Sequence, residues 1–225
     1  MSEDSSPHDV LRVLQSKSET KAFYDKISEF YDALSERSEG PVRDAGLEQL
    51  QVREGESVLE IGFGTGHGLV TLAKSVGPSG KVHGIDLSEG MLGVAARRLK
   101  EENLADRVEL NCGDGADLPY APGSIDAVFM SFTLELFDTP EIPLVLGECK
   151  RVLKPRGRLC VVGMTKEEEG GLISAFEWTH RHFPNFLDCR PIYVQRSIEA
   201  AGFHVKHTTR MEMWVPVEIV LAVKP

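Results

Sequence analysis

The stretch SVLEIGFGTGHG, from Ser57 to Gly68, decides the fold. Its first five residues are mostly apolar, which is typical of a strand buried in a parallel sheet. Three glycines then alternate through Gly62–Gly66, and a helical pattern begins directly after them. Glycines let the chain turn sharply and let a ligand approach the main chain. The exposed N–H groups of a helix start favour electron-rich ligand atoms. The stretch therefore predicts a strand, a ligand-binding turn and a helix.

A second stretch, KVHGIDLS from Lys81 to Ser88, ends a strand-like run with an acid. Asp86 stands about twenty residues beyond the glycine turn, where a carboxylate can accept both hydrogen bonds of a ribose diol. In an open α/β sheet, ligands bind beyond the carboxyl ends of the strands. The two stretches together predict a nucleotide or nucleoside ligand.

Two kinds of ligand are consistent with a glycine turn followed by an acid. The dinucleotide fingerprint is G-x-G-x-x-G, but its third glycine position is His67 here, and the spacing is G-x-G-x-G. Glu60 also precedes the turn, and its charge would be unfavourable beside a pyrophosphate but favourable beside an ammonium group. A cationic amino acid joined to a nucleoside is therefore favoured over NAD.

Strand-like and helical patterns alternate along the rest of the chain, which predicts a parallel sheet with helices on both faces. The fold class expected is α/β, a doubly wound, mostly parallel, seven-stranded Rossmann-like sheet. We expect one domain: an N-terminal helical lid over residues 1–50 that breaks at Gly40–Pro41, a cofactor-binding core over 55–163, and acceptor-shaping helices with a closing hairpin over 164–225. The predicted strands cover 57–61, 82–85, 108–110, 125–130, 159–162, 203–207 and 211–223.

The composition argues against several classes of function. The 225 residues include 35 acidic and 25 basic side chains, a net charge of −10, which disfavours nucleic acid. No apolar run reaches the ~18 residues of a membrane span, and the polar N-terminus shows no signal peptide. The four cysteines are scattered without a C-x-x-C pair, which argues against a metal site and predicts a cytoplasmic protein.

Several motifs resemble those of one enzyme family. VLEIGFGTG is similar to motif I of the class I S-adenosylmethionine-dependent methyltransferases, and VHGIDLSEGML is similar to their second motif. CGDGADLPYAPGSIDAVFMSFTLEL and ECKRVLKPRGRLCVV resemble the segments that follow. The leader FYDKISEFYDAL resembles that of the ubiquinone and menaquinone C-methyltransferase branch.

The resemblance implies S-adenosylmethionine as the cofactor, S-adenosylhomocysteine as its product, and a role for each matching residue. It assigns Asp86 to the ribose hydroxyls, Leu87 and Met91 to the adenine face, and Asp114 with the Gly115 N–H to the adenine edge. Ser131 would lie near the sulfonium. The residues expected around the methionine moiety and the turn are Glu60, Gly62, Gly64 and Gly66.

Methyl transfer needs no signature catalytic residue, so the catalytic candidates rest on position. Tyr24 and Tyr31 lie seven residues apart on one face of a predicted helix; they either contact the cofactor or acceptor, or pack in the core. His180 is on an apolar helical stripe and is either a general base or a packing residue.

The hypothesis is an enzyme that methylates a small, apolar or aromatic acceptor, quinol-like or lipid-like. The alternatives are a methyltransferase acting on a phospholipid or small amine, and a cofactor-binding sensor or scaffold without turnover. The partner expected is a small molecule, without nucleic acid or stable membrane insertion but with transient contact to a membrane surface. The oligomeric state, the pathway and the methylated atom are left open.

Overall fold

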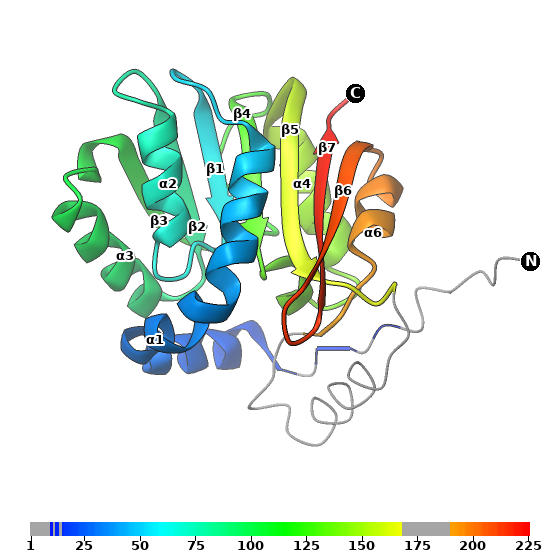
Figure 1. The fold of residues 1–225 in the computed structure, drawn as a ribbon, viewed down its shortest axis with the longest axis horizontal. Helices are drawn as coiled ribbons and strands as arrows, with labels where there is room; N and C mark the ends of the chain where they lie inside the picture. The colour runs from blue at the N-terminus through cyan, green and yellow to red at the C-terminus, as the bar shows by residue number, and fades with distance from the viewer. Residues whose placement is uncertain (1–9, 11, 14, 168–189) are drawn as a thin grey trace, which may run out of the picture.

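The computed structural model describes residues 10, 12–13, 15–167 and 190–225, without the side chains of 29–37. Seven strands form one sheet in the order β3-β2-β1-β4-β5-β7-β6 (Figure 1). They are β1 Ser57–Ile61, β2 Lys81–Asp86, β3 Val108–Cys112, β4 Ile125–Ser131, β5 Leu153–Met164, β6 His204–Glu212 and β7 Pro216–Val223. The first five strands are parallel, and β7 is antiparallel to both its neighbours. The predicted fold class is confirmed.

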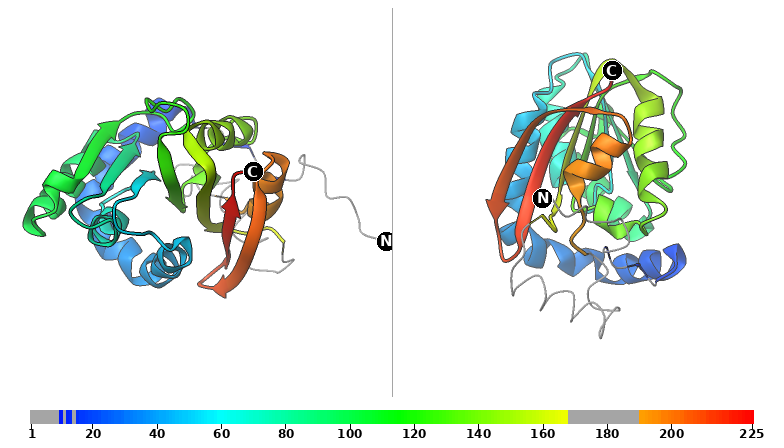
Figure 2. Two further views of the ribbon diagram at one scale, coloured as in Figure 1. Left: turned by 90° about the horizontal axis from the view of Figure 1, so that it is seen from above. Right: turned by 90° about the vertical axis from the view of Figure 1, so that its right-hand side faces the viewer.

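Helices cover both faces of this sheet, and each face has its own apolar layer (Figure 2). One layer packs against α4 Ile142–Val152 and α6 Val194–Ala200. The other packs against α2 His67–Ser75, α3 Glu89–Glu101 and the C-terminal part of α1 Lys17–Leu50. The central strands are buried on both sides, which explains their near-continuous apolar sequence.

Helix α1 runs continuously through Pro41, where the sequence predicted a break. It starts at a capping box, in which the Ser16 side chain accepts from the Glu19 N–H and Glu19 bonds back to the Ser16 backbone. Figure 1 shows α1 crossing one end of the sheet and then turning to run along its face. Proline removes one helical hydrogen bond but does not always end a helix. The prediction of two separate helices was therefore wrong, and α1 has two limbs.

Both limbs of α1 are fixed to the rest of the molecule. In the N-terminal limb, Asp25 Oδ1 accepts from Ser88 Oγ at 2.6 Å and from the Gly90 N–H at 2.9 Å, at the start of α3. In the C-terminal limb, the Leu50 carbonyl accepts from Arg158 Nε at 2.9 Å. A Cβ on Gly46 would overlap the side chains of Val162 and Phe129, so this limb lies close against the sheet.

The C-terminal hairpin confirms the predicted topology but not its boundaries. Residues 213–215 form the turn between β6 and β7, whereas the sequence predicted one strand over 211–223. Met213 and Trp214 lie in this turn, although their apolar side chains are typical of a strand, and Trp214 is 49% exposed. The described part of the chain contains no helix long and apolar enough to cross a bilayer, and no cluster there of three or more metal-ligating side chains.

Candidate functional site

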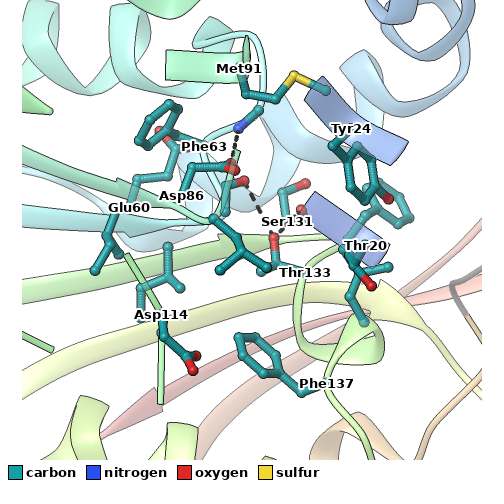
Figure 3. Close-up of a pocket in the computed structure, with 18 of the residues that line it drawn as sticks. Thr20, Tyr24, Glu60, Phe63, Asp86, Met91, Asp114, Ser131, Thr133 and Phe137 are labelled. Carbon is teal, nitrogen blue, oxygen red and sulfur yellow. Dashed lines mark hydrogen bonds between the residues drawn. The ribbon is translucent and has the colours of Figure 1, made fainter. Parts of the chain in front are cut away.

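A cavity opens at the carboxyl ends of β1, β2 and β4, and α1 forms one of its walls (Figure 3). It contains about 1280 Å³ of empty space, including the part open to solvent. Its lining combines the main chain of the glycine turn with the acids Glu60, Asp86 and Asp114, and a few such polar groups are what fixes the orientation of a small ligand in a pocket. It lies at the topological switch point of the sheet, where β1 is flanked by β2 and β4.

The structure brings nearly all the predicted cofactor residues together around this cavity. The exception is Gly66, which faces away: a Cβ there would meet Ala95 of α3. Gly66 instead serves helix packing at the start of α2. The predicted residues that line the cavity are Glu60, Gly62, Gly64, Asp86, Leu87, Met91, Asp114, Gly115 and Ser131.

The glycine turn keeps the floor of the cavity free of side chains. Gly62 has φ +70°, and a Cβ on it would overlap the side chain of Thr133. Gly64 has φ +52° and nothing within 4 Å of a Cβ position, so its backbone faces open space. Glycine adopts such conformations without strain, so the turn presents main chain to the cavity, and its contact with a ligand stays a prediction.

Asp86 is held by main-chain donors at the end of β2. Its Oδ2 accepts from the Gly64 N–H and its Oδ1 from the Ser88 N–H, both at 2.9 Å. Burial raises the pKa of Asp86 above its ordinary value, although these N–H groups act in the opposite direction. The carboxylate thus ties β2 to the glycine turn and retains lone pairs for a diol.

Glu60 is the electrostatically unusual residue of the cavity. Its side chain is buried, and Oε2 has no hydrogen-bond partner among the described residues. Burial raises the pKa of Glu60 to about 8, with the Arg43 charge opposing and the Asp86 charge adding to the shift. An unsatisfied buried carboxyl is costly. A cationic ligand that paired with Glu60 would remove this cost, so the residue fits a ligand with an ammonium group.

Lys17 forms ion pairs with two acids that line the cavity, Asp114 and Glu141. Its Nζ lies 2.5 Å from Asp114 Oδ2 and 2.6 Å from Glu141 Oε1. The other oxygen of Asp114 accepts from the Ala116 N–H at 2.9 Å. Lys17 therefore joins the first turn of α1 to the residue that the resemblance assigned to adenine, a contact that sequence reasoning missed.

The structure places only one of the three predicted catalytic side chains. Tyr24 lines the cavity from α1 (Figure 3). Tyr31 is in the same helix, as its spacing predicted, but its side chain is outside the described part. His180 also lies outside the described residues. Their catalytic roles stay predictions.

A second, smaller space adjoins the cavity, and we call it the apolar compartment. Its empty space, including the part open to solvent, is about 320 Å³. Four residues line both spaces and thus form the junction: Tyr24, Glu39, Phe132 and Leu136. The rest of the compartment consists of Met164, Met213 and Trp214. Sequence reasoning assigned no role to Glu39 or to this compartment.

The doubly wound sheet, the glycine turn and the strand-end acids define a class of α/β proteins that bind nucleoside-containing cofactors at the switch point of the sheet. Comparison with known proteins identifies the family. A profile described as "Methyltransferase domain" matches residues 58–157. The chain is 34% identical over 182 residues to a demethylmenaquinone methyltransferase of Lactococcus lactis, covering 76% of this chain and 71% of that protein. It therefore belongs to the class I S-adenosylmethionine-dependent methyltransferases, in the branch that contains the demethylmenaquinone methyltransferases.

Two further matches agree with this assignment. A demethylmenaquinone methyltransferase of Lactobacillus johnsonii is 35% identical over 140 residues, which cover 62% of this chain and 57% of that protein. The match thus spans less than two thirds of that relative. A crystal structure of an S-adenosylmethionine-dependent methyltransferase from Aquifex aeolicus has a TM-score of 0.67 and 27% identity, covering 90% of this chain and 98% of the other.

Proposed function

We propose that this protein transfers the methyl group of S-adenosylmethionine to a small, apolar or aromatic acceptor of the quinol type. The observation that carries the proposal is the pairing of two spaces. A polar cavity contains Glu60 and the strand-end Asp86, and it shares Tyr24 and Phe132 as lining residues with the apolar compartment. A cationic nucleoside fits the first space and an uncharged apolar molecule fits the second.

In this proposal the chain's own residues bind and orient the two molecules. Asp86 accepts from the ribose hydroxyls, Glu60 faces the ammonium group, and Asp114 with the Gly115 N–H faces the adenine edge. When bound, S-adenosylmethionine supplies an electrophilic methyl group, because its sulfonium sulfur can leave as a neutral thioether. Ser131 and Phe132 lie at the end of β4, between the two spaces, and orient the acceptor.

The quinol-like acceptor has two supports. Relatives of this chain carry the name demethylmenaquinone methyltransferase, and the compartment is lined mainly by sulfur-containing and aromatic side chains. Thioethers and aromatic rings pack well against flat apolar molecules. The proposal includes a cytoplasmic location, in line with the scattered cysteines, and a transient contact with a membrane surface when the acceptor is lipid-like.

Calorimetry and a transfer assay test the proposal. We expect S-adenosylmethionine and S-adenosylhomocysteine to bind while NAD does not, and label from the methyl group to appear on reduced 1,4-naphthoquinone. Binding of NAD alone would contradict the cofactor assignment. Transfer only to phospholipids or small amines would replace the acceptor class. Binding without transfer to any of these would favour a sensor without turnover.

A further inference from the structure

The C-terminal limb of α1 brings one carboxylate to the junction of the two spaces. This limb runs antiparallel to β5, because the Leu50 carbonyl bonds to Arg158 near the start of β5, and the Gly46 carbonyl accepts from Cys160 Sγ at 3.3 Å further along it. Continuing the helix two turns back from Gly46, about 10 Å, reaches Glu39 at the carboxyl ends of β4 and β5. There Glu39 lines both the cavity and the apolar compartment.

The junction offers few groups that can exchange a proton. Of its four residues, Phe132 and Leu136 are apolar, and Glu39 is the one that carries a carboxylate. Phe132 also has φ +50°, a left-handed conformation that is strained in a non-glycine residue and is common at functional sites. Its N–H donates to the Val162 carbonyl at 2.8 Å, which holds its ring at the junction.

A second buried acid lies behind the junction. Glu135 is fully buried; its Oε1 accepts from the Met164 N–H at 3.1 Å, and Oε2 has no hydrogen-bond partner in the described ranges. Burial raises the pKa of Glu135 to about 7, and the charge of Glu39 adds to this rise. Through its hydrogen bond to the Met164 N–H, Glu135 lies beside the wall of the compartment.

We infer that Glu39 is the general base of the methyl transfer and that the apolar compartment holds the acceptor against it. The inference rests on the proposed function. In the step, an electron pair of the acceptor forms the bond to the methyl carbon, and the pair of the broken C–S bond stays on sulfur. The acceptor's proton, from its hydroxyl group or from the attacked ring carbon, moves to a Glu39 carboxylate oxygen and then to water. Phe132, Leu136 and the two methionines of the compartment carry no group that could take this proton.

Two matched ligands test the role of Glu39 without turnover. In the presence of S-adenosylhomocysteine, 1-naphthol can donate a hydrogen bond to Glu39, while 1-methoxynaphthalene cannot. A hydrogen bond to a charged group contributes enough for roughly a tenfold or larger change in affinity. Calorimetry is expected to show that Glu39→Gln lowers the affinity for 1-naphthol by that factor. The affinities for 1-methoxynaphthalene and S-adenosylhomocysteine should be unchanged. The control Glu48→Gln alters an exposed glutamate of the same helix and should change none of these affinities.

Two further experiments test the effect of Glu39 on turnover and the binding of the acceptor in the apolar compartment. With reduced 1,4-naphthoquinone, Glu39→Gln is expected to lower kcat at least a hundredfold with little change in KM, and Glu39→Asp to restore part of it. Met213→Asp is expected to lower the affinity for both naphthalene ligands. The control Leu144→Asp, at a position on α4 that is 60% exposed, should change neither affinity.

The outcomes separate the two proposals. Equal 1-naphthol affinity and kcat within threefold in Glu39→Gln would overturn the role of Glu39. Absence of naphthalene binding by the natural protein with S-adenosylhomocysteine bound would overturn the assignment of the compartment. Failure of the natural protein to bind S-adenosylhomocysteine at all would instead overturn the proposed function.

Discussion

Glu60 is buried and Asp86 is half-buried in the same cavity, and their hydrogen bonding differs. Asp86 accepts from two main-chain N–H groups, whereas Glu60 Oε2 has no such donor among the described residues. Donors stabilise the charged form of a carboxyl group, and burial without donors stabilises the neutral form. Asp86 is therefore prepared to accept hydrogen bonds, and Glu60 is prepared to meet a cation.

Binding of S-adenosylmethionine is expected to release a proton from Glu60. Its pKa of about 8 in the free protein keeps the group mostly neutral at pH 7, and a bound ammonium favours the charged form. Affinity should therefore increase as the pH rises from 7 through about 8. Calorimetry in buffers with different ionisation enthalpies measures the release, and Glu60→Gln should abolish it. The same release in Glu60→Gln would assign the proton to another group.

The same pKa predicts how Glu60 affects folding in the ligand-free protein. The pKa of Glu60 is raised from 4.5 to about 8 by folding, so its stabilising contribution is complete below pH 4.5 and is lost as the pH rises through about 8. Urea denaturation measures the free energy of unfolding of the natural protein and of Glu60→Gln. The difference between the two should change as the pH rises from 4.5 to about 8. A difference that is constant from pH 5 to 9 would contradict it.

Asp86→Ala is expected to weaken S-adenosylmethionine binding by about 1–3 kcal/mol, because the ribose diol loses its acceptor and the Gly64 N–H loses its partner. Titration calorimetry measures the change. Asp106→Ala, at an exposed position, is the control and should bind as the natural protein does. Unchanged affinity in Asp86→Ala would remove Asp86 from the site.

The sequence predicted Glu60 and Asp86 because each stands at the end of a buried strand, where the topology fixes its surroundings. Glu39 and Lys17 could not be predicted in the same way. Their positions depend on how α1 bends and where its limbs dock, and helical periodicity contains no information about either. His180 stays a prediction, since it falls outside the described residues.

At the scale of the elements, α1 connects the site to the core. Its N-terminal limb is held by Asp25 at the start of α3, and its C-terminal limb lies on β4 and β5 through Gly46. The sequence predicted helical structure on both sides of Gly40–Pro41, but it also predicted a break there. Proline is compatible with both a helix end and a bend, and only tertiary contacts decide between them.

Gly46→Ala is expected to destabilise the protein by about 1–3 kcal/mol, because the added methyl overlaps Val162 and Phe129 in a packed layer. Gly147→Ala in α4 is the matched control. Nothing lies within 4 Å of its Cβ position, so alanine should stabilise that helix by about 0.5–1 kcal/mol. Chemical denaturation of both variants measures the contrast. Equal effects would show that the C-terminal limb does not pack closely against the sheet.

At the scale of the whole molecule, the cavity lies at the carboxyl ends of the central strands, and an apolar layer covers each face of the sheet. Alternating strands and helices predicted the doubly wound order, since such crossovers bury a parallel sheet on both sides. The hairpin was predicted with a misplaced turn, because the apolar Met213 and Trp214 look like strand residues in the sequence. The division into lid, core and acceptor-shaping parts stays a prediction.

Ligand binding is expected to stabilise the whole fold, because the cavity contacts β1, β2, β4 and α1 together. S-adenosylhomocysteine at one hundred times its Kd adds about 2.7 kcal/mol, which raises Tm by roughly 5–10 °C for a chain of this size. Differential scanning fluorimetry measures the shift, and NAD at equal concentration should produce none. A shift with NAD but not with S-adenosylhomocysteine would contradict the cofactor assignment.

The continuity of α1 through Pro41 has one more consequence. A loop that covers a cavity can move while the core stays fixed, but a bent helix transmits its motion along its axis. The two limbs are one unbroken helix, so a displacement of the N-terminal limb that admits a ligand is expected to strain the limb packed against β4 and β5. Substitutions on the interior-facing side of this helix are therefore expected to change ligand entry, although they touch neither bound molecule.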